Sequence, residues 1–309
     1  MEPLLTPSKY VNPMIDVAFK YLFGTEKNKR LLKGLLEHVF KKEILDITYN
    51  NTERIGDSQE NRNAYFDVLC KANNGPDFIV ECQVQPQEHF AERAIFYCAR
   101  TISAQAPKGD WDYNFHPVYF LALINFPLPN SGSRSEGYVH SFSILNDDTS
   151  APMTDKVRFV FMEVGPFEKS KEECVSFEER FLFYMKNLPT FAEEPDTVDD
   201  DYFEDLLKAA EYFNMDKETQ EQYERRLKAM RDSKNVEDYM KKMARKAGLE
   251  EGRAEGRAEG RAEGRAEGRA EVRADVARKM VSMGLEVSVI AEATGLSPEE
   301  IEALRPMEA

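Results

Sequence analysis

The sequence predicts an α/β fold followed by a helical C-terminal region, and three observations carry this prediction. Two strand-like runs with a cluster of turn formers between them, over residues 65–84, are typical of a β-hairpin. A helical pattern over residues 88–104 then precedes a fully apolar run over residues 118–125, which is typical of a buried strand. From Ser176 onward the apolar residues recur at helical spacing, with charge-rich connections.

Two helices and a short strand are expected before the hairpin. Asn12 can cap a first helix with Pro13 at its first position, and Gly24 is expected to end that helix. A second helix is predicted over residues 27–40, and a short strand over residues 44–49. The remaining predicted elements are strands over residues 138–145 and 157–164 and helices over residues 176–187, 200–213 and 217–230.

The net charge of −15 is unevenly distributed along the 309 residues. Residues 1–130 hold 14 Lys/Arg and 16 Asp/Glu, residues 131–240 hold 14 and 26, and residues 241–309 hold 13 and 14. The acidity is therefore concentrated in the middle, so any contact of the N-terminal third with DNA must use a local basic face. Strong unspecific DNA binding at physiological salt is not expected.

Nothing in the sequence predicts export or membrane insertion. No apolar run approaches the roughly 18–20 residues that span a bilayer. The first five residues lack the basic start and the apolar core of a secretory signal. The four cysteines form no CxxC pair and mostly lie in apolar runs, which is typical of buried thiols in a reducing compartment: Cys70, Cys82, Cys98 and Cys174. We therefore expect a cytoplasmic protein with no membrane partner.

The hairpin brings acidic residues onto one face of the sheet. Side chains alternate along a strand, so Glu81, Gln83 and Gln85 share a face of the second strand. If residues 73–77 form a five-residue connection, Asp67 opposes Gln83, and Glu81 is a diagonal neighbour of Asp67 on the same face. A connection of even length would place the two carboxylates on opposite faces, barring a bulge.

Two carboxylates converging on one face can hold a hard divalent cation such as Mg²⁺, which prefers oxygen ligands and keeps several waters. A metal ion at Asp67 and Glu81 could polarise a phosphodiester and activate a bound water. The alternative is that both residues are surface positions of an amphipathic hairpin. Glu81 favours the metal site, because it lies in a mostly apolar strand where an unpaired carboxylate is costly to bury.

The residues from about 12 to 126 resemble the Rpn-type recombination-promoting nuclease and transposase family, within the PD-(D/E)XK nuclease superfamily. The segments that carry this resemblance occur in the expected order and cover a little over a third of the chain: residues 16–24, the strand of Asp67, and residues 80–85, 93–97 and 123–126. A repetitive stalk and a small helical tail near the C-terminus are also similar to members of that family.

The resemblance implies a restriction-endonuclease-like mixed sheet flanked by helices, in the order αβββαβ, and metal-dependent DNA cleavage. Asp67 and Glu81 would hold Mg²⁺, with Mn²⁺ as a possible substitute, and Asp16 would match an extra acidic residue that some members supply. Gln83 stands where the wider superfamily has Lys, although members of this family often have Gln. A neutral amide supplies no positive charge, so the resemblance leaves the roles of base and electrophile open.

Four further residues are candidate substrate or DNA contacts: Lys20, Gln85, Arg93 and Tyr97. Lys20 lies one helical turn after Asp16 and could replace the missing charge; alternatively it is an ordinary surface lysine. Arg93 and Tyr97 are four residues apart on one helix face. They could contact phosphate or support the active-site strand, or be a packing tyrosine with an exposed arginine.

Residues 251–270 are five identical copies of Glu-Gly-Arg-Ala. Like charges recur every four residues and each Gly costs about 1 kcal/mol relative to Ala, so this segment is a poor isolated helix. We expect a spacer or stalk, with self-association along the Gly/Ala row as the alternative. The tail that follows resembles a helix-turn-helix, but its last helix, residues 297–305, is acidic, which favours a protein–protein element over base readout.

These observations predict four regions: a nuclease-like domain over residues 1–165, a helical accessory region over 166–250, the stalk over 251–273 and the tail over 274–309. The function they favour is a Mg²⁺-dependent DNA endonuclease that promotes recombination, in a transposase-like or anti-phage setting. The alternative is a catalytically inactive, nuclease-like module that binds DNA or assembles with other proteins. A homo-oligomer formed through the stalk is possible in either case.

Overall fold

The structure is a computed structural model that describes residues 8–50, 67–73, 75–129, 137–193 and 200–304. The first two residues of the predicted hairpin strand, Asn74 in the turn, and Arg305 at the end of the acidic helix lie outside the described residues. The chain divides into two compact units, Met1–Met230 and Arg231–Ala309.

The first unit is built on a six-stranded mixed sheet with the order β1-β2-β3-β4-β6-β5. The β2–β3 and β5–β6 pairs are antiparallel, whereas β3–β4 and β4–β6 are parallel. The strands are β1 (Ile47–Tyr49), β2 (Val68–Ala72), β3 (Asp77–Gln83), β4 (Val118–Ile124), β5 (Val139–Ser143) and β6 (Val157–Glu163). Two helices precede β1 and one lies between β3 and β4, which confirms the mixed sheet and the αβββαβ order.

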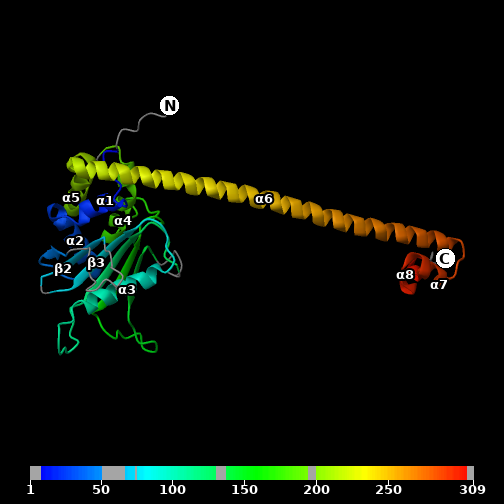
Figure 1. Cartoon of the computed structure of the whole chain (residues 1–309), viewed down its shortest axis with the longest axis horizontal. Helices are drawn as coiled ribbons and strands as arrows, with labels where there is room; N and C mark the ends of the chain where they lie inside the picture. Colours follow the sequence, from blue (N-terminus) through cyan, green and yellow to red (C-terminus); the bar gives the residue numbers. More distant parts are fainter. Residues whose placement is uncertain (1–7, 51–66, 74, 130–136, 194–199, 305–309) are drawn as a thin grey trace. The chain divides into compact units, whose positions relative to one another are not determined.

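Helices cover both faces of this sheet, as Figure 1 shows. One face packs against α1 (Asp16–Phe23), α2 (Lys29–Phe40), α4 (Phe177–Asn187) and α5 (Asp201–Ala210), and the other against α3 (Phe90–Ser103). The alternation along β3 explains this division, because Phe78 and Val80 belong to the first core and Ile79 to the second. All of β4 is buried, as expected for a central parallel strand.

The first helix begins later than predicted. Asn12 does not cap a helix that starts at Pro13; its side-chain oxygen accepts a hydrogen bond from Met14 N (3.0 Å), and α1 begins at Asp16. Proline at position 13 therefore lies in a turn before the helix. The end is as predicted, because the N–H of Gly24 bonds to the carbonyl of Lys20. A short 3-10 turn, Glu26–Asn28, then leads into α2.

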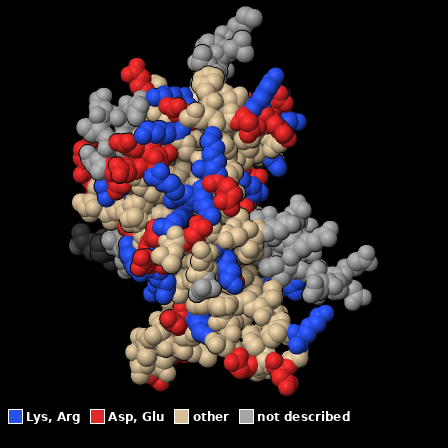
Figure 2. All heavy atoms as spheres, turned by 90° about the vertical axis from the view of Figure 1, so that its left-hand side faces the viewer, with Lys and Arg blue, Asp and Glu red and all other residues tan. Residues whose placement is uncertain are grey.

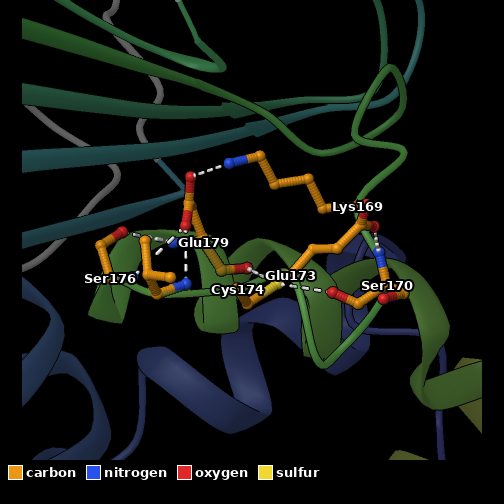
Figure 3. Close-up of polar contacts among 7 residues, drawn as sticks. Lys169, Ser170, Glu173, Cys174, Ser176 and Glu179 are labelled. Carbon is orange, nitrogen blue, oxygen red and sulfur yellow. Dashed lines mark hydrogen bonds and ion pairs between the residues drawn. The ribbon is translucent and has the colours of Figure 1, made fainter.

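Local contacts hold the start of α4, and Figure 3 shows them. The Ser176 hydroxyl accepts a hydrogen bond from Glu179 N (3.1 Å), and the Glu179 carboxylate accepts one from Ser176 N (3.3 Å). This reciprocal capping box satisfies two backbone donors at the helix start. Lys169 pairs with Glu179, and the Cys174 thiol donates to the Glu179 carbonyl (3.6 Å). The preceding loop is thus tied to the first turn of α4.

The helical region after α5 differs from the prediction in two ways. The helix predicted over residues 200–213 ends at Ala210, because Glu211 leaves the helix to form a β-bridge with Tyr10. The elements predicted as separate, over residues 217–230, 251–273 and 274–283, form one helix of 66 residues, α6 (Lys217–Ser282). The cost of each glycine is local and does not interrupt the chain of backbone hydrogen bonds.

The second unit ends in three packed helical segments. Ala277 near the end of α6, Ile290 in α7 (Val287–Thr294) and Ile301 in α8 (Pro298–Ala303) are fully buried against one another. Gly284 and Gly295 separate the segments with φ angles of 74° and 68°, which favour glycine. Ser297 forms a capping box with Glu300 at the start of α8.

Charge is interleaved on the surface of the first unit. Figure 2 shows Lys and Arg side chains between Asp and Glu side chains over one face, so positive charge occurs there in local patches. None of the helices in the described ranges combines the length and the apolar composition that crossing a membrane requires.

Candidate active site on β2 and β3

The β2–β3 hairpin places Asp67 directly opposite Glu81. Leu69 pairs with Ile79 and Val68 with Val80, so continuing the register by one residue joins the two acidic positions. The prediction that Asp67 opposes Gln83 was wrong. The bond from Ala72 N to Pro76 O (3.0 Å) pairs these two residues across the turn, so residues 73–75 connect the strands and not residues 73–77. This shift changes the register by two and therefore keeps both carboxylates on one face.

Each carboxylate has one oxygen bonded to the backbone of the opposite strand. Cys82 N donates to Asp67 Oδ2 (2.8 Å), and Asp67 N donates to Glu81 Oε1 (3.3 Å). Their side chains are 21% and 7% exposed, so both lie largely out of water. Among the described residues, the second oxygens have longer contacts with cationic side chains: Asp67 Oδ1 lies 3.7 Å from Lys20 Nζ, and Glu81 Oε2 lies 4.0 Å from Arg93 Nη2. The backbone therefore orients the pair and leaves two oxygens available.

Lys20 and Asp16 come to this site from α1. Lys20 Nζ lies 2.8 Å from Asp16 Oδ1 and 3.7 Å from Asp67 Oδ1, so the ammonium group lies between the two aspartates. Because the two residues are four apart on one helix, their side chains share a face, and there they form an ion pair. The positive charge of Lys20 is thus held beside the carboxylates.

Arg93 on α3 approaches from the other side. Its Nη2 donates to Gln83 Oε1 (2.9 Å) and lies 4.0 Å from Glu81 Oε2. The guanidinium carbon lies 5.8 Å from the centre of the Tyr97 ring, which is a cation–π contact. Gln85 is exposed, and its carbonyl oxygen accepts a hydrogen bond from Gln83 Nε2 (3.0 Å). Arg93 therefore brings positive charge to the strand position where Gln83 supplies none.

The pKa values reflect this crowding of buried charges. Burial first, and the nearby charge of Asp67 second, raise the pKa of Glu81 to about 8. Burial also raises the pKa of Asp67. Burial acts to lower the pKa of Lys20, but its bond to Asp16 and the charges of Asp16 and Asp67 outweigh this effect and raise it. Glu81 is thus poised to be neutral or charged near pH 8.

The donor set fits a hard divalent cation. Asp67 Oδ1 and Glu81 Oε2 are oxygen ligands from neighbouring strands, and a cation would offset the cost of burying both charges. Within the described ranges, no group of three or more His, Cys, Asp or Glu side chains is close enough to hold a metal. The protein would therefore supply two carboxylates, with Asp16 nearby in its pair with Lys20, and Mg²⁺ commonly keeps waters at its other positions.

Comparison with known protein families matches residues 13–240 to the family described as PD-(D/E)XK nuclease family transposase. The chain belongs to this family. Residues 271–306 match the C-terminal HTH domain of the Rpn/YhgA-like nuclease family, which confirms the helix-turn-helix character of the tail. Comparison with curated proteins and with solved structures gave no match. The family match confirms the resemblance seen over residues 12–126 and extends it through the helical region that follows.

The structure brings together residues of this nuclease family that are far apart in the sequence. One connected set of contacts joins seven of the candidate site residues: Asp16, Lys20, Asp67, Glu81, Gln83, Arg93 and Tyr97. The sequence predicted a helix that begins at residue 217, but not its position beside α1, where it forms a groove next to Asp16 and Lys20. No local pattern could reveal this neighbour, because α6 begins about two hundred residues later in the chain.

Proposed function

We propose that this protein is a metal-dependent DNA endonuclease that hydrolyses phosphodiester bonds, with Asp67 and Glu81 as its metal ligands and Asp16 as an accessory acid. The observation that carries this proposal is the direct opposition of Asp67 and Glu81 in a site largely shielded from water, each with one oxygen available. The family of nucleases to which the chain belongs supports a hydrolytic role. Mg²⁺ is the proposed cofactor, and Mn²⁺ the proposed substitute.

A divalent cation bound there would polarise the phosphodiester and lower the pKa of the attacking water. The protein's own groups orient the two carboxylates, because backbone N–H groups of the opposite strand bond to Asp67 and Glu81. Gln83 is bonded at both ends of its amide, to Arg93 and to the Gln85 carbonyl, so its orientation is fixed. Arg93 supplies charge to the phosphate that the amide cannot.

Lys20 supplies positive charge on the α1 side of the same carboxylates. It would contact a phosphate oxygen of the substrate, and so supply the positive charge that the wider superfamily takes from a lysine at position 83. Tyr97 packs against Arg93 and keeps the guanidinium near Glu81.

The setting we propose is DNA recombination, in a mobile-element or anti-phage context, in the cytoplasm. The C-terminal HTH domain would contribute a second contact, either with DNA or with another protein. The acidic last helix, with Glu299, Glu300 and Glu302, favours a protein partner over base readout.

Nicking of supercoiled plasmid in Mg²⁺ or Mn²⁺ tests this function. The natural chain should nick the plasmid, and Asp67→Ala and Glu81→Ala should reduce nicking to background, with EDTA abolishing it. Glu88→Ala is the matched control, because this substitution removes the same charge from a side chain that is 90% exposed. Equal nicking by all four proteins would show that a contaminant cuts the plasmid and would overturn the proposal.

A catalytically inactive module that binds DNA is the second candidate. Lys20 and Arg93 already lie beside the two carboxylates, so charge in the site is partly compensated without a metal ion. A chain that binds DNA but shows no metal-dependent nicking, and binds no Mn²⁺ in calorimetry, would establish this second function.

A further inference from the structure

A groove of about 690 Å³ lies between α1 and the first turns of α6, within the Met1–Met230 unit. On the α1 side it is lined by residues between Asp16 and Thr25. On the α6 side Thr219, Gln222, Arg226 and Ala229 line it at spacings of three and four residues, with Arg225 beside them. Such spacing means that a single face of α6 forms this wall.

The charged groups that line the groove are mostly cations. Lys20, Arg225 and Arg226 face it, and Asp16 is the acidic lining residue. Arg225 and Arg226 are exposed, and in the described part of the chain neither forms an ion pair with a carboxylate. Arg225 Nε donates to the Glu221 carbonyl (3.2 Å), which leaves the rest of its guanidinium available.

Two acidic residues on the same turns of α6 have hydrogen-bond partners other than the two arginines. Glu218 accepts a hydrogen bond from Gln222 Nε2 (3.3 Å). Glu224 bonds to the hydroxyl of Tyr212, which lies before the helix and is not part of the groove lining. Neither Glu218 nor Glu224 therefore pairs with the two arginines.

The groove lies next to the candidate active site. Lys20 lines the groove and is also 3.7 Å from Asp67 Oδ1, so the groove and the carboxylates share this residue. From Thr219 to Ala229 the helix rises about 15 Å, at roughly 1.5 Å per residue. This length corresponds to about four nucleotides along one strand of a duplex, at about 3.4 Å each.

We propose that the α1–α6 groove holds the sugar–phosphate backbone of the DNA strand flanking the cleaved bond, with Arg225 and Arg226 contacting its phosphates. This inference rests on the proposed nuclease function, because it takes the carboxylates as the point of cleavage. Arginine presents several N–H donors to phosphate oxygens and makes such contacts without reading bases. The groove would thus position DNA for cleavage independently of its sequence.

The first test is DNA binding by the full chain with Arg225→Gln and Arg226→Gln combined. Affinity for a 20-base-pair duplex is measured by fluorescence anisotropy in Ca²⁺, across a range of salt concentrations. We expect binding at least about tenfold weaker, and a salt slope reduced by about 2, because two phosphate contacts are lost. The matched control is Lys217→Gln with Lys228→Gln, two exposed lysines of α6 outside the groove lining, which should change affinity less than about twofold.

The second test is local and does not depend on how much the C-terminal HTH domain contributes to affinity. Phenylglyoxal modifies exposed arginines, and mass spectrometry reports each site. DNA should protect Arg225 and Arg226 but not Arg231, which is exposed and turned more than about 100° away from them on the same helix.

The results separate the groove from the cleavage chemistry. Loss of affinity and DNA protection of the two arginines would support the groove even if Asp67→Ala and Glu81→Ala showed that the chain does not cut. Unchanged affinity together with unprotected arginines would overturn the proposal that the groove binds DNA, even if metal-dependent nicking were established. A natural chain that binds no duplex at low salt would overturn it as well.

Discussion

Glu81 and Glu163 are two glutamates of one sheet, with side chains 7% and 5% exposed, yet their surroundings differ. Glu163 Oε1 accepts a hydrogen bond from Leu128 N (2.7 Å) and lies 3.2 Å from His140 Nε2. These contacts join the loop after β4, the end of β6 and the start of β5. Glu163 is thus a structural carboxylate whose partners are fixed parts of the fold.

Glu81 shares its site with a second carboxylate instead. Asp67 lies opposite it, the nearest cation to its free oxygen is Arg93 at 4.0 Å, and its pKa is raised to about 8 by burial and by Asp67. Burial alone therefore does not mark a functional acid. Both glutamates accept one backbone hydrogen bond, but Glu81 also lies opposite a second acid, and a cation would offset the repulsion between the two charges.

The largest effect we predict separates these two glutamates by activity. Glu81→Gln should reduce metal-dependent nicking by about a thousandfold or more, because it removes a metal ligand. Glu163→Gln should change the rate less than about threefold at a temperature where the protein is folded, since it keeps an oxygen that can accept from Leu128 N. The nicking rates of the two variants, measured side by side, check this. Similar losses in both would mean that the comparison reflects only folding.

The pH dependence of stability gives the next largest effect. The pKa of Glu81 is raised from 4.5 to about 8, so in this range the folded protein binds more protons than the unfolded chain. The contribution of Glu81 to stability without metal should therefore be greatest below pH 4.5, and should fall by about 4 kcal/mol as pH rises to 8. Urea unfolding in EDTA at several pH values measures this.

In Glu81→Gln this part of the slope should disappear, because the amide does not titrate. An unchanged slope in that variant would contradict the raised pKa. Metal ions should bind more weakly as pH falls below 8, because protons compete for the same oxygen.

Replacing each of the two glutamates by leucine compares their contributions to the free energy of unfolding. Glu163→Leu should cost about 2 kcal/mol, because the buried Leu128 N–H loses its acceptor. Glu81→Leu also removes the acceptor of Asp67 N, but this bond is longer (3.3 Å) and the change removes a buried charge beside Asp67, so it should cost less than Glu163→Leu at pH 8. Urea midpoints in EDTA at pH 8 decide this, and an equal or larger loss for Glu81→Leu would contradict our interpretation.

The smallest predicted effect concerns Lys20. Lys20→Met keeps the length of the side chain but removes the charge near Asp67, and should slow nicking by about tenfold. Lys108→Met, at an exposed position away from the site, is the control. An unchanged rate in Lys20→Met would show that Lys20 does not supply charge to the reaction.

Much of the site could be predicted from alternation and spacing. The parity of the hairpin predicts that Asp67 and Glu81 share a face, and the four-residue spacing predicts that Asp16 and Lys20 share a face of the first helix. The register itself was missed, because it depends on one hydrogen bond across the turn, Ala72 N to Pro76 O, which composition does not reveal.

The parts that sequence could not predict depend on distant contacts or on cooperative structure. The approach of α6 to α1 joins segments about two hundred residues apart, and no periodic pattern reports such a pair. The continuity of α6 through the Glu-Gly-Arg-Ala copies was also missed, since propensity assigns a cost to each glycine but does not predict where a helix ends. Added Cβ atoms at Gly252 and Gly256 would meet nothing within 4 Å, so no packing within the chain constrains these positions.

Calorimetric titration of the full chain with Mn²⁺ at pH 8 tests most directly whether Asp67 and Glu81 form a metal site. We predict a binding event in the natural chain and in Glu163→Gln, lost in both Asp67→Asn and Glu81→Gln. Equal Mn²⁺ binding by all four proteins, or none by the natural chain, would contradict the assignment of the β2–β3 carboxylates as metal ligands.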